Sequence, residues 1–281
     1  ASCSFTFTPG NGLRYLYAKF KNAFDTESAI VFDDIYLEVA GEDSGPTYIS
    51  DKILLYDKTW TAKGSPYIIT ENYLIPSGVK LIIEPGAEIR FDTNVELVID
   101  GALWAVGTAD SPILFTANKT IKTKGHWKWI KFRDSSIDNE CRLSYCKIEY
   151  GTQGIIADYA SPLISNCEIE NHSQYGIYLY QSSNFLITDN IIKNNNSMGI
   201  YLNSYFTGGT ISNCLIENNN SWGIQLESPG SVDGPNNILI QNNIIRNNQY
   251  GIFMQSYWSN RTMSATVENN IIENNNTTNL G

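Results

Sequence analysis

Aromatic side chains recur beside a glycine–isoleucine dipeptide in the second half of the chain. The pattern reads GIYLY at 176–180, GIYLN at 199–203, GIQLE at 223–227 and GIFMQ at 251–255. Flat rings with amides and carboxylates between them suit sugars, which have apolar ring faces and hydroxyl edges. The candidate ligand-binding residues are Tyr178, Tyr180, Tyr201, Asn203, Tyr205, Trp222, Glu227, Tyr250, Phe253 and Trp258.

The same aromatic row has a structural alternative. Tyrosine is enriched in strands because its ring packs against cross-strand neighbours, and this packing needs no ligand. The sequence leaves both interpretations open, namely a sugar-binding surface and a row of strand-stabilising rings.

Catalysis near this row would depend on few titratable residues, and Asp158, His172 and Glu227 are the candidates. A glycosidase needs two carboxylates about 5–10 Å apart. Asp158 and Glu227 stand three glycine–isoleucine segments apart, which corresponds to roughly 14 Å between strands. A uronate lyase needs a base and a cation, but these segments carry no outward Lys or Arg. His172, like His126, is predicted to be a solvated turn residue, so no catalytic residue is assigned.

The aromatic segments belong to an internal repeat. Each repeat can be aligned on a cysteine or asparagine that stands two residues before an isoleucine, and we call this the aligned position. Successive aligned positions are 21, 23, 24, 29 and 27 residues apart. They are occupied by Cys146, Cys167, Asn190, Cys214, Asn243 and Asn270.

Each repeat contains two or three short, alternating, β-branched strands between turn residues, with no helical period. One coil of this length cannot stand alone, because ordering over twenty residues costs about 1–2 kcal/mol each. Stacking of coils pairs every strand and closes the core. The repeat therefore predicts an all-β, parallel β-helix solenoid.

The residue before each aligned position is predicted to adopt a left-handed backbone at a bend, because Asn and Asp tolerate it. The aligned position is predicted to hold small inward side chains, with asparagines forming an amide ladder along the axis. Cys146 and Cys167 would then lie on adjacent coils, within disulfide distance, although stacked reduced thiols are favoured. The asparagine runs at 194–196, 218–220 and 274–276 are predicted to turn the chain toward the glycine–isoleucine strand.

Residues at the same position of successive repeats would stack into columns on the outer surface, and two such columns are predicted. Three positions after the aligned position stand Glu149, Glu170, Lys193, Glu217, Arg246 and Glu273. They are interpreted as a solvated charge ladder, worth a few tenths of a kcal/mol per pair, in preference to a catalytic row. The second column holds Ile191, Leu215, Ile244 and Ile271. It is either an interface with another segment or subunit, or an error in the inward and outward assignment.

The chain is expected to divide into three parts. Residues 1–42 are predicted to be the last strands of an antiparallel sandwich, 43–66 a linker or N-terminal cap, and 67–281 the β-helix. The repeats occupy about 143–276. Because the sequence stops where the next glycine–isoleucine strand is expected, the β-helix is predicted to be truncated at its C-terminus within a longer modular protein.

Composition narrows the possible partners. The chain has 281 residues, a net charge of −10 and a pI of about 4.7. Nucleic acid is not expected as a partner, because phosphate binding needs clustered Lys and Arg. No run approaches the roughly 18 apolar residues of a membrane helix. Five cysteines occur without a CxxC pair, so neither a metal nor another cofactor is expected.

Residues 67–150 resemble the right-handed parallel β-helix proteins of the pectin-lyase-like superfamily. The similarity lies in IPSGVKLIIEPGAEIRF, GALWAVGTADSPILFTA and the following W…I.F…SS…L.YC.IEYG pattern. Residues 143–276 are similar to PbH1-type repeats. YLYAKFKNAFDTESAIVFDDIYLEV resembles the final strands of bacterial Ig-like modules. The resemblance implies a secreted or cell-surface protein that handles polysaccharides.

Three functions are consistent with this resemblance. The first is a non-catalytic extracellular module that binds polysaccharide or cell-surface glycan through the aromatic strand face, beside other modules of the same polypeptide. The alternative is a polysaccharide lyase or glycoside hydrolase of the pectin-lyase-like superfamily. The third is an architectural spacer or self-associating surface protein. We take the binding module as the leading hypothesis.

Overall fold

The computed structural model describes residues 12–19, 21, 27–29, 31–37, 44–182, 184–203, 207–228, 236–256 and 263–276. The chain divides into two compact units, Ala1–Ser44 and Gly45–Gly281. In the first unit, β1 (Gly12–Ala18) and β2 (Val31–Leu37) pair antiparallel, with Gly12 opposite Leu37. The antiparallel pair is as expected, whereas membership of an Ig-like module stays a prediction.

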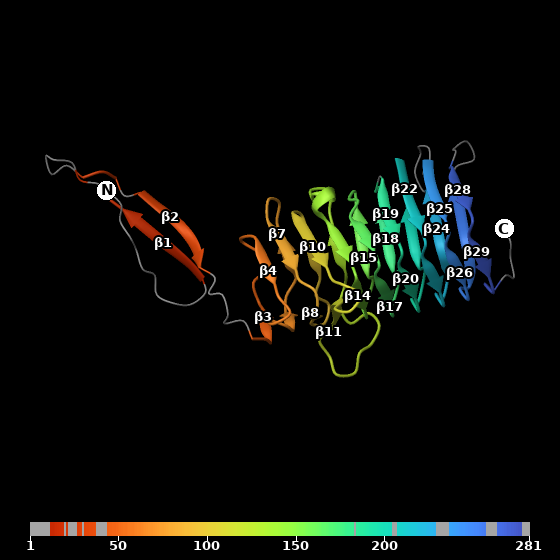
Figure 1. The fold of residues 1–281 in the computed structure, drawn as a ribbon, viewed down its shortest axis with the longest axis horizontal. Coiled ribbons are helices and arrows are strands. Elements are labelled where there is room, and N and C mark those ends of the chain that lie inside the picture. Colours follow the sequence, from red (N-terminus) through yellow and green to blue (C-terminus); the bar gives the residue numbers. More distant parts are fainter. Residues whose placement is uncertain are drawn as a thin grey trace. The chain divides into compact units, whose positions relative to one another are not determined.

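The second unit is a parallel β-helix built from three sheets (Figure 1). Neighbouring strands within each sheet come from neighbouring coils and pair in parallel. Within the described residues, the first sheet has eight strands: β6 (Tyr73–Ile75), β9 (Leu97–Ile99), β12 (Ile130–Phe132), β15 (Ile155–Asp158), β18 (Ile177–Tyr180), β21 (Ile200–Asn203), β24 (Trp222–Ser228) and β27 (Tyr250–Ser256).

The other two sheets have nine and ten strands within the same residues. The nine-strand sheet contains β4 (Lys58–Trp60), β7 (Lys80–Ile83), β10 (Ala102–Val106), β13 (Arg142–Ser144), β16 (Leu163–Ser165), β19 (Phe185–Thr188), β22 (Thr207–Ser212), β25 (Asn236–Gln241) and β28 (Ala265–Glu268). The ten-strand sheet contains β3 (Thr47–Ile49), β5 (Tyr67–Ile69), β8 (Glu88–Phe91), β11 (Ile113–Ala117), β14 (Cys146–Glu149), β17 (Glu168–Glu170), β20 (Ile191–Lys193), β23 (Leu215–Glu217), β26 (Ile244–Arg246) and β29 (Ile271–Glu273). One short 3-10 helix, η1 (Asp138–Glu140), precedes β13.

The predicted fold class is confirmed, and the first strands of the β-helix lie before residue 67. β3 pairs with β5, and β4 pairs with β7. Both β3 and β4 come from the segment 43–66 that was expected to be a linker or cap. Their pairing satisfies one edge of β5 and of β7, which would otherwise present unpaired backbone groups.

The core changes character along the β-helix. In the first coils it is aromatic, with the rings of Trp60 and Tyr67 4.7 Å apart and those of Phe91 and Trp127 4.2 Å apart. From β14 onward it is made mostly of isoleucine and leucine side chains from all three sheets. The isoleucines two positions after the aligned position are fully buried from Ile148 to Ile245, as predicted.

A glycine opens each predicted glycine–isoleucine strand because neighbouring coils approach closely there. A Cβ atom on Gly176 would lie 2.7 Å from the carbonyl oxygen of Gly199 and 2.8 Å from Cγ2 of Ile192. Any side chain would therefore force the coils apart. The same steric limit explains why glycine keeps its place in every repeat.

The first corner of each repeat, between the nine-strand and ten-strand sheets, is built as predicted. The residue before the aligned position is left-handed in all six repeats, with φ between 49° at Tyr145 and 57° at Asp189. Asn190 occupies the next position and bonds along the axis, since its Oδ1 accepts from the backbone N–H of Cys167 at 2.9 Å. In the last coils the ladder joins amide to amide, with Asn243 Nδ2 donating to Asn270 Oδ1 at 2.9 Å.

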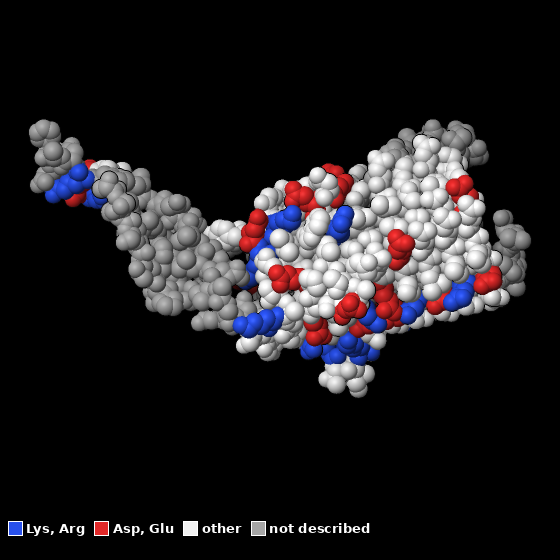
Figure 2. Space-filling model, viewed as in Figure 1, with Lys and Arg blue, Asp and Glu red and all other residues white. Residues whose placement is uncertain are grey.

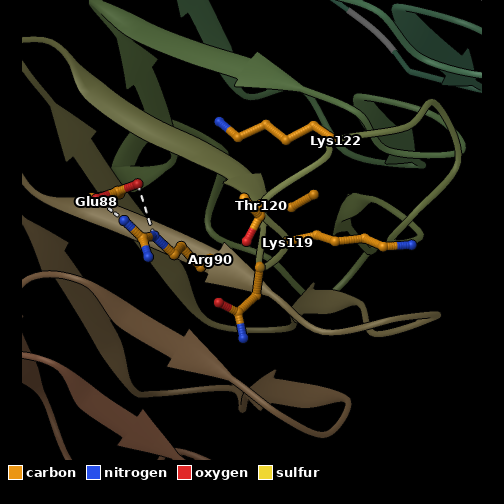
Figure 3. Close-up of a pocket in the computed structure, with 7 residues that line it drawn as sticks. Glu88, Arg90, Lys119, Thr120 and Lys122 are labelled. Atoms are coloured by element: carbon orange, nitrogen blue, oxygen red, sulfur yellow. Dashed lines mark hydrogen bonds and ion pairs between the residues drawn. The ribbon is translucent and has the colours of Figure 1, made fainter.

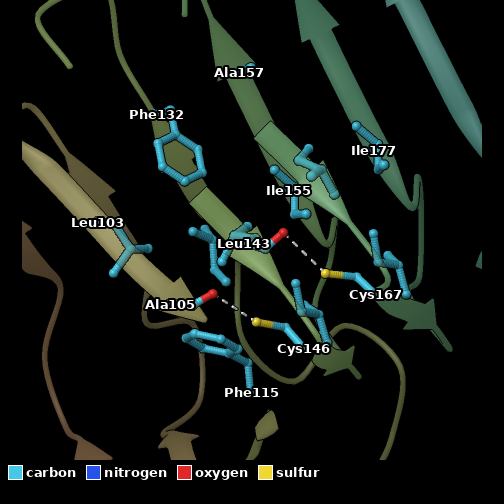
Figure 4. Packing of buried hydrophobic residues seen from close by; sticks show 14 of the residues in the cluster. Leu103, Ala105, Phe115, Phe132, Leu143, Cys146, Ile155, Ala157, Cys167 and Ile177 are labelled. Carbon is cyan, nitrogen blue, oxygen red and sulfur yellow. Dashed lines mark hydrogen bonds between the residues drawn. The ribbon is translucent and has the colours of Figure 1, made fainter. Parts of the chain in front are cut away.

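Cysteines fill the remaining aligned positions as buried, reduced thiols (Figure 4). The Sγ atom of Cys146 donates to the carbonyl oxygen of Ala105 at 3.5 Å, and that of Cys167 donates to Leu143 at 3.4 Å. Burial raises the pKa of Cys146 well above its usual value and that of Cys214 to about 11. These thiols therefore stay protonated at neutral pH.

A second ladder, which the sequence analysis missed, lies at the next corner. The middle residue of each asparagine run points inward, and its Oδ1 accepts from the coil before. Asn195 donates its backbone N–H and its Nδ2 to Asn219 Oδ1, at 3.1 and 2.9 Å. Asn219 donates to Asn248 in the same way, and Asn248 to Asn275.

The third corner, between the eight-strand and nine-strand sheets, has a variable length. β15 ends at Asp158 and β16 begins at Leu163, whereas β24 ends at Ser228 and β25 begins at Asn236. By contrast, the first corner keeps one length from β16 onward. The spread in repeat length therefore arises mainly at the third corner.

Candidate functional site

The candidate ligand-binding residues that the structure describes lie on the outer surface of the eight-strand sheet. Strand pairing aligns one outward column, which holds Ile156, Tyr178, Tyr201, Gln225 and Phe253. A second column, two residues further along each strand, holds Asp158, Tyr180, Asn203, Glu227 and Gln255. The glycine–isoleucine segments that the sequence aligned are therefore in register, and the side chains alternate along each strand.

Three tyrosines form one aromatic cluster on this surface. The rings of Tyr178 and Tyr201 stack with centroids 5.2 Å apart and an angle of 19° between planes. Tyr175, just before β18, lies 5.7 Å from Tyr178 and 5.2 Å from Tyr201. Tyr180 makes an edge contact with Tyr159 at 5.6 Å. All but Tyr159, which is exposed, are partly buried, so faces or edges of their rings reach solvent.

A second aromatic cluster is centred on Trp222. Its ring stacks on Tyr250 at 4.0 Å and on Phe253 at 4.4 Å. Trp222 and Tyr250 are neighbours across β24 and β27. We call the tyrosine cluster and this tryptophan cluster together the aromatic face.

Polar groups fill the surface between the two clusters. The hydroxyl of Tyr201 donates to Glu227 Oε2 at 2.6 Å, and Asn203 Nδ2 donates to the Tyr201 hydroxyl at 2.9 Å. Gln225 donates its Nε2 to the other carboxylate oxygen of Glu227. Within the described part of the chain, Asn203 Oδ1 and Gln225 Oε1 have no hydrogen-bond donor. Two amide acceptors are therefore uncommitted beside the rings.

The three tyrosines of the tyrosine cluster are hydrogen-bond donors and not bases. Burial raises the pKa of Tyr178 to about 12 and raises that of Tyr175 as well. Burial, together with the hydrogen bond to Glu227, raises the pKa of Tyr201 further. These phenols keep their protons at neutral pH.

A cation lies on the same sheet and was missed by the sequence analysis. β12 places Lys131 next to Ile156, two coils before Tyr178, with Ile130 and Phe132 pointing inward. The Nζ atom of Lys131 lies 2.7 Å from Asp158 Oδ2. The alternation of apolar and polar residues in Ile130–Phe132 could have indicated from the sequence that Lys131 points outward. The glycine–isoleucine strands themselves carry no outward Lys or Arg, but their sheet does.

Comparison with known proteins identifies the family from the repeat region. A profile described as "Right handed beta helix region" matches residues 130–280, which is more than half of the chain. The chain belongs to the right-handed β-helix family. No curated protein matches it at a significant level.

One solved structure similar to this β-helix is the A-module of mannuronan C-5 epimerase AlgE4 from Azotobacter vinelandii. The sequence identity is 12% and the TM-score is 0.47, over 68% of this chain and 66% of that one. The match thus spans just under two thirds of the epimerase module. A similarity at this TM-score supports no inference about activity or substrate.

The three catalytic candidates are not brought together in this β-helix. Asp158 and Glu227 share one outward column, but Tyr180 and Asn203 stand between them. Three strand spacings of ~4.8 Å separate the two carboxylates, or roughly 14 Å.

Two residues of the predicted ligand-binding set, Tyr205 and Trp258, lie outside the described residues.

His172 is a core residue, so the prediction of a solvated turn is wrong. Its side chain is 0% exposed and occupies the second ladder, one coil before Asn195. Nδ1 accepts the backbone N–H of Gly151 at 3.0 Å, and Nε2 lies 3.1 Å from the carbonyl oxygen of Ile148. These are the roles that Oδ1 and Nδ2 play in the asparagines. His126 is also buried, at 8% exposed.

The column from Glu149 to Glu273 is a charge ladder on the ten-strand sheet, but its first carboxylates are buried. Figure 2 shows acidic and basic side chains alternating along this edge of the β-helix. Glu149 and Glu170 are 5% and 7% exposed. Lys147 Nζ lies 2.7 Å from Glu170 and 3.6 Å from Glu149. Lysines reach across two coils and exclude water from these carboxylates. The sequence did not predict this burial.

The ladder charges support each other electrostatically. Burial acts to lower the pKa of Lys147, but its hydrogen bond to Glu170 and the nearby carboxylates raise it overall. Burial likewise acts to raise the pKa of Glu168, and Lys193 and Lys147 lower it overall.

The apolar column from Ile191 to Ile271 does point outward on the same sheet, with these two side chains 39% and 53% exposed.

The described part of the chain brings no three His, Cys, Asp or Glu side chains together as a metal site. It also contains no helix with the length and apolar character needed to span a membrane.

Proposed function

We propose that this β-helix is a non-catalytic, extracellular module that binds polysaccharide through its aromatic face. The observation that carries the proposal is the pairing of two aromatic clusters with polar groups between them. Trp222 and Phe253 stack 4.4 Å apart, and Tyr178 and Tyr201 stack 5.2 Å apart. Rings of this kind pack on the apolar faces of sugars, while the neighbouring amides bond hydroxyl groups.

The uncommitted acceptors favour a hydroxyl-rich ligand. Asn203 Oδ1 and Gln225 Oε1 have no donor in the described structure, and buried acceptors gain free energy when they are paired. Both acceptors are buried, so the two amides must rotate outward before sugar hydroxyls, which are donors of the required kind, can reach them. The carboxylate of Glu227 already accepts hydrogen bonds from Tyr201 and Gln225. It therefore fixes the orientation of these two side chains and is not placed to attract a cation.

The charges on this sheet favour neutral or mixed polysaccharides. Lys131 is paired with Asp158, and Arg133 Nη1 lies 3.4 Å from Asp100 Oδ2. Neither cation is therefore free to neutralise a row of substrate carboxylates. A polymer of mostly uncharged sugars needs no such cation.

A binding role also fits the positions of the titratable groups. Tyr201 and Tyr178 stay protonated at neutral pH because burial raises their pKa. Asp158 and Glu227 stand too far apart for a carboxylate pair. The groups on this face are therefore placed to hold a ligand and not to transfer protons.

We propose an extracellular or cell-surface location together with this ligand, since the polysaccharides of cell walls and capsules lie outside the cell. The partner is then a polysaccharide or a cell-surface glycan. The unit that contains β1 and β2 is proposed to belong to a neighbouring Ig-like module of the same polypeptide.

The aromatic face can be tested with Trp222→Ala and Tyr201→Ala. Each change removes a ring from one cluster, and we expect affinity for the bound polysaccharide to fall about tenfold, which corresponds to about 1.4 kcal/mol. Affinity gel electrophoresis through neutral and mixed polysaccharides measures the effect. Tyr48→Ala is the matched control, because Tyr48 is an exposed tyrosine, at 66%, on β3 of another sheet.

Two outcomes would overturn the proposal. Unchanged retardation of both variants would mean that the aromatic face is structural only. Shortening of the polymer after incubation with wild-type protein would establish a lyase or hydrolase instead. In that case Asp158→Asn and Glu227→Gln would show which carboxylate the reaction needs.

A further inference from the structure

One outward column of the ten-strand sheet changes character at β20. On the earlier strands this column is mostly charged, and strand pairing places in it Glu88, Leu114, Lys147 and Glu168. From β20 to β29 the same column is entirely aliphatic, with Ile191, Leu215, Ile244 and Ile271. Four apolar side chains thus follow one another on the outer surface at a spacing of about 4.8 Å.

The charged positions on the earlier strands are satisfied within the chain, whereas the aliphatic positions are left in water. On β8, Arg90 donates its Nε and Nη2 to Glu88 at 2.9 and 3.0 Å, beside residues 118–122 (Figure 3). The ion pairs described above do the same for β14 and β17. By contrast, Ile191 and Ile271 are 39% and 53% exposed. A contiguous row of exposed apolar side chains is typical of an interaction surface.

A column of alternating charges runs beside the aliphatic column, two residues further along each strand. From β20 to β29 it holds Lys193, Glu217, Arg246 and Glu273. The first charge is opposite in sign to the last, and the second is opposite to the third. Two copies of this column that run in opposite directions therefore place every charge against one of opposite sign. We call both columns from β20 to β29 the strip.

We propose that the strip binds the strip of a second copy of this chain, in an antiparallel dimer with two-fold symmetry. The axis is parallel to the strands and passes between β23 and β26. Leu215 then contacts Ile244 of the partner subunit, and Glu217 meets Arg246 of the partner subunit. At the ends of the strip Lys193 meets Glu273 of the partner subunit. Each contact occurs twice, because the same surface is used on both copies.

Other positions of the axis match the strip less well. An axis through β26 would place Arg246 against its own copy, and an axis through β23 would do the same for Glu217. An axis between β20 and β23 would keep opposite charges together but set Ile244 against Glu168 of the partner subunit. An axis between β26 and β29 would leave Leu215 uncovered. Only the position between β23 and β26 matches both columns on all four strands.

The charges of the strip keep bonding capacity for a partner. Arg246 donates its Nε to Glu217 Oε2 at 2.8 Å within the chain, and a guanidinium has four further N–H donors. Within the described residues Glu273 has no ion pair. In the dimer these donors reach Glu217 of the partner subunit, and Glu273 gains a cation.

Exposed asparagines border the strip on both sides and fit the same arrangement. Asn213 and Asn242 lie at the first corner, Asn218 and Asn247 at the second, and all four are exposed. In the antiparallel dimer Asn213 faces Asn242 of the partner subunit, and Asn218 faces Asn247 of the partner subunit. An amide carries donors and an acceptor, so these pairs can bond each other.

The size of the strip indicates a reversible dimer. Four strands extend about 19 Å along the axis, and three residues extend about 10 Å along each strand. This area is smaller than the roughly 800 Å² per partner of a standard interface. Association is therefore expected to depend on protein concentration.

Sedimentation velocity of the full chain, over a range of concentrations up to the millimolar, tests the dimer. Leu215→Gln is expected to weaken association about tenfold, because side chains at the centre of an interface contribute most to binding. Leu215 points outward, so this variant should fold as wild type does. Leu186→Gln is the matched control, because Leu186 is an outward leucine of β19 on the nine-strand sheet and is 41% exposed.

A charge exchange tests the antiparallel register. Glu273→Lys is expected to weaken association about tenfold, because it places a lysine against Lys193 of the partner subunit. Adding Lys193→Glu should restore association. Within one chain these two positions are three strands apart, or roughly 14 Å, so a rescue would arise between chains. Circular dichroism of each variant verifies that it is folded, since Lys193 also pairs with Glu168 in its own chain.

Three results would contradict the proposal. A monomer at every concentration would overturn the dimer, and a dimer that Leu215→Gln and Glu273→Lys leave unchanged would show that another surface is used. A dimer that is weakened by Glu273→Lys but is not restored in the folded double variant would overturn the antiparallel register. The strip and the aromatic face lie on different sheets, so either proposal can fail without the other.

Discussion

Replacing Asn219 by leucine is expected to lower the free energy of unfolding by about 3 kcal/mol or more. Asn219 is 2% exposed, and its Oδ1 accepts both the backbone N–H and the Nδ2 of Asn195. Leucine has a similar size but no acceptor, so both donors of Asn195 would be buried without a partner. Each such group costs about 1–3 kcal/mol.

Chemical denaturation followed by circular dichroism measures this loss, with Asn220→Leu as the matched control. Asn220 is the next residue, is exposed, and makes only a 3.5 Å side-chain bond to Asn196. Its replacement is expected to change stability by no more than about 0.5 kcal/mol. Equal stability of the two leucine variants would show that the second ladder contributes little.

The second large effect is expected when the pH is lowered around His172. Burial lowers the pKa of His172 to about 3 in the folded chain, compared with about 6.5 in the unfolded chain. Between these values the unfolded chain binds a proton that the folded chain does not. The stability from neutral His172 is therefore complete above pH 6.5 and is lost progressively as the pH falls toward 3.

His172→Asn should remove this dependence without breaking the ladder. Asparagine can accept the Gly151 N–H and donate to Ile148, as the other ladder asparagines do in their coils. One proton changes the free energy of unfolding by about 1.4 kcal/mol per pH unit. Between pH 6.5 and 4.5, where the unfolded histidine goes from half to fully protonated, the wild type should therefore lose about 2 kcal/mol more than the variant.

The comparison isolates His172 because both proteins keep His126 and every carboxylate, including the buried Glu149 and Glu170. Urea denaturation at several pH values gives the two curves. Parallel curves between pH 6.5 and 4.5 would show that His172 does not titrate on unfolding.

The repeat made the solenoid predictable because each signal had one structural meaning. Asn and Asp before the aligned position indicated a left-handed bend, and the backbone has positive φ there from Tyr145 to Asn269. The exchange of Cys and Asn indicated a small inward side chain, as at Cys146 and Asn190. Local steric rules were sufficient for these predictions, since they depend on one residue and its neighbours one coil away.

The features that the sequence did not reveal depend on side-chain reach or on context beyond the repeat. His172 imitates an asparagine, which becomes visible only when its two ring nitrogens are placed against Gly151 and Ile148. Lys131 stands on β12, outside the recognisable repeats, so its column was not apparent. The burial of Glu149 follows from Lys122 and Lys147 bending over it.

The alignment of the candidate residues follows from the sequence, but their contacts do not. Alternation along the strands was enough to align Tyr178 with Tyr201 and Asn203 with Glu227. The bond from Tyr201 to Glu227 runs diagonally between columns, and it depends on rotamers that no sequence pattern specifies. Such diagonal contacts decide whether a tyrosine donates to a ligand or to its own neighbour.

The unequal corners of the coil have an evolutionary consequence. Ladders of buried amides bind two corners to the coils on either side, so an inserted residue there would break several bonds at once. The third corner, where β24 ends at Ser228 and β25 begins at Asn236, already differs in length between coils. Insertions and deletions should therefore accumulate at this corner, beside the aromatic face. Related chains could exchange loops and change their ligands while keeping the same scaffold.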